Sequence, residues 1–425
     1  MGRNSLYPQL EKTLLFINNI EKIYGKILKA KRKIIFLVKN FFTKRDYDRF
    51  SIKFYQENDI DVEIWDITSL LEKKDYEKLI KPYDQIKTDY VKQIDNIQEI
   101  EDRLKDLNHK VLVSVHLVYN LQSFKVFRLL SKYKTNFILY ETSSPGFLFY
   151  RYEDKNFFYK LTYLRKYLNF NFLYNYFINF ILRNVNPRIF GINCATYLIV
   201  GGAIYLKKKN NLVDKTTKII WTHQKNYDLF LKNKNNNYEK AGKKYIAFID
   251  QAVPFHNELI SMNIKMNAEE YYSSLENFFV LIKEKYNMEV KICAHPRDPD
   301  KISKYIKKFV VEKDKTIENI KNCSFVICHD SIAINFAVMY EKPILFIYNN
   351  VLENVKNFDH LNFIKRYAKL FKKKPINIDK IGNLDINREL KIDKKCYDEY
   401  FKNYIKFKGE NKFQCETIKD LVYSL

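Results

Sequence analysis

Short runs of almost continuously apolar residues recur along this chain, and they constrain its fold more than any other feature. The first half contains KIIFLVKNF (33–41), VEIWDIT (62–68), KVLVSVHLV (110–118) and NFILYE (136–141). A strand that is apolar at successive positions has to be buried on both faces, as in a parallel sheet covered by helices. The stretches between these runs, such as LQSFKVFRLLSKY, have helical patterning. The alternation predicts an α/β fold with a doubly wound parallel sheet.

The second half repeats this alternation, with the runs KYIAFIDQ (244–251), MEVKICAHP (288–296), SFVICHDS (324–331) and PILFIYN (343–349). A chain of 425 residues exceeds one ordinary core, so we expect two domains. Polar stretches rich in Lys and Asn, at 207–218 and 232–244, separate the halves. We predict two Rossmann-like domains, residues 1–215 and 216–425, that face an interdomain cleft. The helical tail from about residue 385 is expected to pack back across the first domain.

The charge of the chain favours an anionic partner. It has 74 Lys and Arg against 50 Asp and Glu, a net charge of +24. Such an excess is typical of proteins that meet nucleic acid, an anionic membrane face or a phosphorylated substrate, although a compositional bias toward Lys would also produce it. No Arg-rich tail, zinc spacing or aromatic ribonucleoprotein signature is present. We therefore expect a membrane surface or phosphorylated substrate, and no nucleic acid.

The remaining composition indicates a cytoplasmic protein at the inner membrane face. Six cysteines, mostly in apolar runs, are expected to be reduced thiols, and the N-terminal segment carries charges through its apolar part, unlike a signal peptide. Residues 189–206 are uncharged, but their three glycines and β-branched residues favour two short strands around a Gly-Gly turn over a spanning helix. The aromatic segment 156–183 is either a buried helical pair or a surface that dips into a membrane interface.

Polar side chains follow three of the predicted strands in the second half. They are Asp250, His295-Pro296-Arg297 and His329-Asp330-Ser331. Ligands of open parallel sheets lie beyond the carboxyl ends of the strands, so these residues are candidates for a common site. Pro296 ends a strand in any case, because it cannot continue the ladder. His295 could donate to a phosphate or act as an acid, and Arg297 would add a fork of donors.

Ser331 is placed where the next predicted helix begins. Asp330 or Ser331 could be a plain N-cap. Alternatively, the free N–H groups and positive end of that helix would bind a phosphate, with the serine hydroxyl adding a hydrogen bond. Asn335, one turn further on, would lie on the same face as Ser331.

With the apolar helix and the strand EKPILFI that follow, this pattern resembles the donor half of GT-B glycosyltransferases. Bacterial sialyltransferases and Kdo transferases of capsule and lipopolysaccharide have a His-Pro motif followed by a Ser/Thr-rich motif, and CDP-glycerol glycerophosphotransferases are similar. The matching residues here are His295, Pro296 and Ser331, within residues 245–350. The resemblance implies a CMP- or CDP-linked donor whose phosphates contact both motifs. It also implies that the histidine assists departure of the nucleotide.

The sequence departs from the sialyltransferase pattern because the Asp/Glu-Asp-Gly motif that supplies the base is absent. Glu141 at the end of NFILYE, and Asp250, are the two alternatives for that base, and a cap or loop role is open for each. His223 and Asp228, near the predicted hinge, are weaker acceptor-side candidates or structural residues. Asp-x-Asp pairs occur, but none follows a strand as a metal ligand would, so we expect no metal and no cofactor beyond the nucleotide-sugar.

Together these features predict an inverting, metal-independent glycosyltransferase. It would move a sugar from a CMP-linked donor, of the sialic acid or Kdo kind, to a surface glycan or lipid-linked acceptor. A CDP-glycerol-type polyol-phosphate transferase is the alternative among enzymes. A nucleotide- or glycan-binding protein without catalysis is the alternative outside them. The sequence makes no prediction of oligomeric state.

Overall fold

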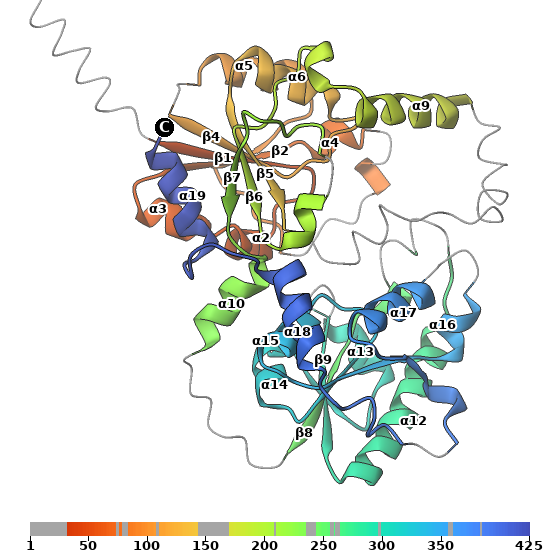
Figure 1. Ribbon diagram of the computed structural model, residues 1–425. Coiled ribbons are helices and arrows are strands. Elements are labelled where there is room, and N and C mark those ends of the chain that lie inside the picture. Colours follow the sequence, from red (N-terminus) through yellow and green to blue (C-terminus); the bar gives the residue numbers. More distant parts are fainter. Residues whose placement is uncertain are drawn as a thin grey trace, which may run out of the picture.

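The computed structural model contains two parallel sheets, one in each half of the chain (Figure 1). It describes residues 32–73, 76–78, 84–107, 110–142, 170–207, 210–234, 244–255, 259, 264–295, 299–355, 360–382 and 385–425. The first sheet has the order β3-β2-β1-β4-β5-β6-β7. Its strands are β1 (Lys33–Val38), β2 (Asp61–Asp66), β3 (Val91–Gln93), β4 (Val111–Val115), β5 (Asn136–Glu141), β6 (Tyr197–Val200) and β7 (Lys218–Trp221).

The second sheet has the order β10-β9-β8-β11-β12-β13. Its strands are β8 (Tyr245–Ile249), β9 (Glu289–Cys293), β10 (Val310–Glu312), β11 (Val326–Cys328), β12 (Ile344–Tyr348) and β13 (Ile376–Asn377). Every pairing between these strands is parallel. Both sheets run outward in two directions from a first strand, β1 or β8, which is the Rossmann arrangement.

Helices cover both faces of each sheet (Figure 1). In the first half they are α2 (Lys44–Arg49), α3 (Ile52–Glu57), α4 (Thr68–Leu71), α5 (Ile97–Lys105), α6 (Phe124–Lys132) and α9 (Phe170–Asn184). The linker carries α10 (Lys225–Lys234). The second half has α12 (Ala268–Tyr286), α13 (Pro299–Tyr305), α14 (Thr316–Asn322), α15 (Ile334–Met339), α16 (Asn350–Asn354), α17 (His360–Leu370) and α18 (Lys394–Tyr400). A π-helical turn, η6 (Phe401–Ile405), and α19 (Gln414–Tyr423) complete the chain.

The apolar runs are buried as their sequence predicts. In β1, Ile35 and Leu37 belong to one core cluster, while Ile34, Phe36 and Val38 belong to another on the opposite face of the sheet. All of them are less than a tenth exposed. Successive side chains of a strand point to opposite faces, so an uninterrupted apolar run requires cover on both sides.

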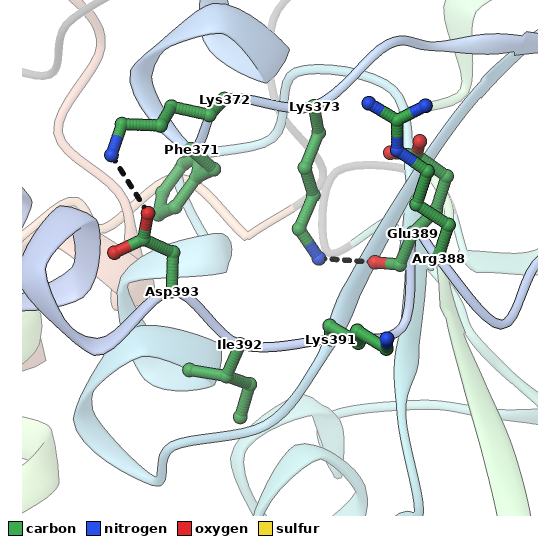
Figure 2. Close-up of a pocket in the computed structure, with 8 residues that line it drawn as sticks. All are labelled: Phe371, Lys372, Lys373, Arg388, Glu389, Lys391, Ile392 and Asp393. Atoms are coloured by element: carbon green, nitrogen blue, oxygen red, sulfur yellow. Dashed lines mark hydrogen bonds and ion pairs between the residues drawn. The ribbon is translucent and has the colours of Figure 1, made fainter.

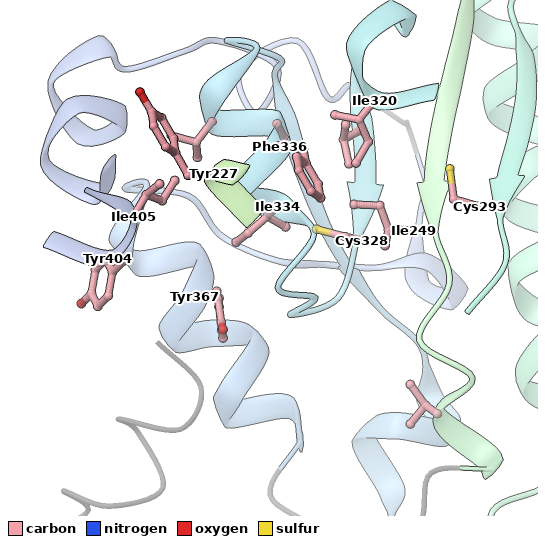
Figure 3. Packing of buried hydrophobic residues seen from close by; sticks show 14 of the residues in the cluster. Tyr227, Ile249, Cys293, Ile320, Cys328, Ile334, Phe336, Tyr367, Tyr404 and Ile405 are labelled. Carbon is pink, nitrogen blue, oxygen red and sulfur yellow. The ribbon is translucent and has the colours of Figure 1, made fainter. Parts of the chain in front are cut away.

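The segment after α18 ties the two domains together. Tyr400 of α18 donates from its hydroxyl to Asn335 of the second domain, at 2.8 Å. Figure 3 shows Tyr404 and Ile405 of η6 near second-domain core residues. The chain then continues to α19, whose Ile418 and Val422 lie in a core cluster of the first domain. We call residues 401–413 the C-terminal strap.

The backbone of the strap contacts the backbone of the Gly201-Gly202 turn directly. The Phe407 N–H donates to the Gly201 carbonyl at 3.0 Å, and the Gln224 N–H donates to the Ile405 carbonyl at 2.8 Å. A Cβ atom on Gly202 would lie 1.9 Å from the carbonyl oxygen of Asn403. Only glycine leaves room for this contact.

The sequence predicted this architecture: two Rossmann-like domains and a C-terminal helix that returns to the first domain. The fold is of the GT-B type. The sheets divide between Trp221 and Tyr245, whereas the sequence-based boundary lay after residue 215, ahead of β7. The second strand predicted within 189–206 is wrong, because Ala203–Lys207 forms a 3-10 helix where the strap covers the glycine turn. Along the described part of the chain, no helix combines the length and apolar character needed to cross a membrane.

We predict that Gly202→Ala destabilises the protein by about 1–3 kcal/mol, because the added methyl group forces two backbone segments apart. Gly382→Ala is the matched control, since a Cβ at that position has no neighbour within 4 Å. Thermal unfolding followed by circular dichroism measures both. Equal midpoints for the two variants would show that the strap does not need the close approach.

Candidate functional site

The strand order of the second sheet reverses between β8 and β11, which are direct neighbours. Asp250 follows β8 and Asp330 lies just beyond β11, so both residues flank this switch point at the carboxyl end of the sheet. A crevice forms where adjacent strand connections leave in opposite directions, and ligands of Rossmann-like sheets bind there. The structure thus places two of the candidate residues from the sequence at this edge.

Asp250 is held in a tight turn. Its Oδ1 atom accepts hydrogen bonds from the Ala252 N–H at 3.1 Å and from the Tyr272 hydroxyl at 3.5 Å. Oδ2 is buried and has no hydrogen-bond partner among the described residues. Burial raises the pKa of this carboxyl to about 6, although backbone N–H groups of Ala252, His295 and Gln251 favour the ionised form. The group is therefore more basic than an ordinary aspartate.

Asp330 is fixed by a small polar network. The side chain of Gln251 forms two hydrogen bonds with Asp330. Its Nε2 donates to Asp330 Oδ1 at 2.9 Å, and its Oε1 accepts from the Asp330 backbone N–H at 3.0 Å. His360 Nε2, at the start of α17, lies 2.8 Å from the same Oδ1. Burial acts to raise the pKa of Asp330, but His360 and the Gln251 amide outweigh it and lower the pKa. The network fixes the ends of β8 and β11 relative to each other.

His329 points the opposite way, into the core. Its Nδ1 donates to the Ile347 carbonyl at 2.7 Å, so its Nε2 accepts from the Tyr271 hydroxyl, also at 2.7 Å. The ring is fully buried, and burial lowers the pKa of His329 to about 4. Both ring nitrogens are used inside the fold. The predicted contact of His329 with a donor is therefore wrong, and the residue is a neutral structural histidine.

Asn335 is structural as well. It is buried in α15, where its Oδ1 accepts from Tyr400 and so joins α15 to α18. Ser331 is half-buried in the loop before α15, and its Oγ accepts from the Ala333 N–H at 3.2 Å. α15 begins only at Ile334, so Ser331 is not its N-cap. The serine O–H can still be donated to a ligand at the switch point.

His295 lies beside Asp250, as the pairing of β8 with β9 requires. Ile249 and Cys293 are opposite each other in that pairing, and the two strands end together. The His295 N–H faces the Asp250 carboxylate, and its side chain is half-buried. Pro296 and Arg297, which were predicted to bind the donor with it, lie outside the described residues.

Glu141 is placed in the first domain, where it ends β5. It is buried, and its Oε1 accepts from the Asn210 side-chain amide at 3.0 Å. It thus joins the end of β5 to the loop that follows β6. Its candidacy as a base stays a prediction.

His223 and Asp228 anchor the C-terminal strap. The Nε2 atom of buried His223 is 3.0 Å from the Lys412 carbonyl oxygen, and its Nδ1 is 3.2 Å from that of Gln224. Asp228 accepts from the Gln414 N–H at 3.0 Å, at the first residue of α19. These contacts support the structural one of the two alternatives for both residues.

The structure adds residues that the sequence interpretation missed. Gln251 and His360 complete the Asp330 network. In the first domain, His116 follows β4 at the equivalent switch point, with its Nε2 2.9 Å from the Ser114 hydroxyl and its ring 4.5 Å from the Phe50 ring centre. Burial, Lys225 and Arg49 hold the pKa of His116 well below 6.5. The sequence did offer a signal for His116, because it directly follows an apolar run that forms a strand. No such signal precedes His360 in the sequence.

A pocket of about 190 Å³ lies elsewhere, between the end of α17 and the loop before α18 (Figure 2). Lys373 spans it and donates to the carbonyl oxygens of Glu389 and Ile344, the latter at 2.8 Å, while Lys372 pairs with Asp393. Ile344 is the first residue of β12, so this pocket is at the amino end of the sheet. It is therefore separate from the switch point.

Within the described residues, no three His, Cys, Asp or Glu side chains are grouped as metal ligands would be.

Neither a protein-family model nor a curated protein matches the chain. Three similar solved structures are a UDP-GlcNAc 2-epimerase from Methanocaldococcus jannaschii (14% identity, 92% of this chain and 99% of that chain, TM-score 0.44), the S. aureus MnaA-UDP co-structure (13%, 92% and 96%, 0.45) and MurG from Acinetobacter baumannii (9%, 93% and 100%, 0.43). The strand orders of the two sheets define the fold.

The pKa of Asp250 predicts a pH dependence of stability. Its folded-state pKa of about 6 exceeds the usual value of 3.8, so the unfolded chain releases this proton first as pH rises. Stability is therefore lost between about pH 4 and pH 6, by up to about 3 kcal/mol from this group. Asp250→Asn should lack this loss, so its stability relative to wild type should increase across that window.

Denaturant unfolding at a series of pH values measures the effect. Asp314→Asn is the matched control, because Asp314 is an exposed aspartate of the same domain in a left-handed conformation that asparagine also adopts. If Asp250→Asn and wild type keep a constant stability difference from pH 4 to pH 7, the raised pKa is contradicted.

Proposed function

We propose that the chain is a glycosyltransferase that takes a sugar from a nucleotide-linked donor held by the second domain. The observation that carries this proposal is the polar cluster at the β8–β11 switch point, where Gln251, next to Asp250, is hydrogen-bonded to Asp330 and Ser331 follows in the chain. Rossmann-like sheets bind nucleotides at this position. His295 of the His-Pro motif and Ser331 lie after the ends of β9 and β11, which are the strands that flank β8.

The donor phosphates are assigned to the Ser331 loop and to His295. The serine hydroxyl and loop N–H groups can donate to phosphate oxygens, and His295 would support the charge that develops on the departing nucleotide. Gln251, Asp330 and His360 are assigned a positioning role, because their mutual hydrogen bonds fix the two strand ends. Such a frame holds ligand-binding groups in place before the donor arrives.

The base that takes the proton of the acceptor hydroxyl is proposed to be Asp250 or Glu141. The raised pKa of Asp250 supports the former, since a group that ionises near pH 6 is a better proton acceptor at neutral pH than an ordinary carboxylate. Glu141 lies in the first domain, on which the acceptor is expected. Direct displacement by that hydroxyl would invert the configuration at the sugar carbon.

In its finer form, the proposal is a CMP-linked donor such as a sialic acid-like or Kdo sugar. The acceptor would be a surface glycan or its lipid-linked precursor, reached at the inner face of the cytoplasmic membrane. The motif resemblance supports this choice, and it equally fits a CDP-glycerol-type polyol-phosphate transferase. A non-catalytic nucleotide-binding protein would use the same donor-side residues.

Thermal stabilisation by a panel of CMP-, CDP-, UDP- and GDP-linked donors tests the donor site. A ligand at 100 times its Kd stabilises the folded state by about 2.7 kcal/mol, so the preferred nucleotide should raise the midpoint by several degrees. Ser331→Ala should lose much of this gain, whereas Ser424→Ala, an exposed serine on the first-domain side, should keep it. Stabilisation by UDP or GDP donors alone contradicts the CMP assignment, and no stabilisation by any donor contradicts the proposed function.

Donor turnover by Asp250→Asn and Glu141→Gln tests the chemistry. We expect one of the two to lose at least about a hundredfold in kcat with donor binding retained, as removal of a general base does. If both variants bind the donor and keep the wild-type rate, neither carboxylate is the base. If wild type binds the donor without turnover, the non-catalytic alternative is supported.

A further inference from the structure

Helix α9 presents its apolar stripe to solvent. Leu173, Tyr176, Phe177 and Phe180 follow the spacing of one helix face, and each is between 42% and 60% exposed. In a helix that covers a core, this stripe would be the buried side. Here the residue that is buried is Leu182, which projects from the opposite side of the helix.

The orientation of α9 is fixed by hydrogen bonds on its inner side. Asn179 accepts from the Leu121 N–H at 2.8 Å. The Asn211 amide donates to the carbonyl oxygens of Leu182 and Val185 at 3.1 and 3.3 Å. Figure 1 shows the helix projecting from the first domain beyond α6. The exposed stripe is thus the outward face of an anchored element.

Two further apolar side chains on or after α9 are exposed. Tyr174 is 52% exposed on the helix flank, and Ile189, just beyond the helix, is 74% exposed. We call the four stripe residues together with these two the α9 patch. An apolar stripe exposed along one helix face is rare on soluble monomers and marks a binding surface. Tyrosine and phenylalanine suit a membrane–water interface, because their rings enter the acyl boundary while the phenol stays hydrated.

The charge around the patch identifies an anionic partner. From residue 170 to 207, the described part of the chain around the patch has Arg183, Arg188 and Lys207 and no acidic residue, and Arg188 pairs with Asp214. Arg183 is exposed beside the stripe, one turn after Phe180. A second copy of this chain would bring two such positive segments face to face, and that contact would be repulsive. An anionic lipid surface would attract the positive charge and would also bury the apolar stripe.

We propose that the α9 patch docks the chain on an anionic lipid bilayer. Over its described length, Phe170–Asn184, α9 has 15 residues and is about 22 Å long, shorter than a spanning helix, so we place it in the interface plane. Its aromatic side chains would enter the headgroup region, and Arg183 would meet the lipid phosphates. The inference adds a docking surface to the proposed function, whose lipid-linked acceptor would then lie within reach.

Flotation of the full chain with vesicles tests the proposal. Vesicles of phosphatidylcholine with phosphatidylglycerol should carry the wild-type protein, and pure phosphatidylcholine vesicles should bind it much less. Phe177→Ser/Phe180→Ser should lower the partition coefficient about tenfold or more, through loss of buried apolar area. Arg183→Gln should lower it about fivefold and reduce its salt dependence.

Leu229→Ser/Leu281→Ser is the matched control, because both leucines are exposed to a similar degree away from α9. It should float as wild type does. Two results would overturn the proposal: wild-type flotation of Phe177→Ser/Phe180→Ser, or a wild-type dimer in sedimentation that this variant abolishes. Unfolding midpoints verify that each variant is folded. Transfer to a soluble acceptor should survive the loss of vesicle binding, so failure of docking is distinguishable from failure of the proposed activity.

Discussion

The close contact between the C-terminal strap and the Gly201-Gly202 turn is the interaction on which the two-domain arrangement depends. Backbone hydrogen bonds to Gly201 and Gln224 lead the chain from the second domain onto the first. From there α19 adds Ile418 and Val422 to the first core. His223 and Asp228 hold the end of the strap, so the polar residues of the linker are used for assembly. The relative position of the two domains is therefore set by backbone contacts of the strap, which Gly201 and Gly202 permit because they have no Cβ atom.

This arrangement separates positioning residues from residues that can contact a ligand. At the switch point, Gln251 and His360 bond Asp330, while His329 turns into the core to Tyr271. Buried hydrogen bonds of this kind restrict the geometry of the side chains that they join, because the low-dielectric surroundings strengthen each bond. The loop of Ser331 and the end of β9 are held on this frame. The proposed donor contacts are therefore few, and the hydrogen bonds of Gln251, Asp330 and His360 hold the strand ends that carry them.

The fold could be predicted from the sequence because strands buried on both faces leave continuous apolar runs. Site prediction was less complete. His329 and Asp330 are adjacent in the chain, yet one side chain enters the core and the other joins the network, and no pattern separates them in advance. His360 comes from the start of α17, distant in sequence from Asp330. The segment after the glycine turn was wrongly predicted as a second strand, because the turn is covered by a segment about 200 residues away in the sequence.

We proposed that a nucleotide binds where β8 and β11 diverge. A crystal structure of the chain with the nucleotide that stabilises it most is the direct test. The account predicts that the phosphates lie within hydrogen-bond distance of the Ser331 loop, next to the end of β9. Phosphates bound instead at the Lys373 pocket, at the amino end of the sheet, or beside His116 in the first domain would contradict it.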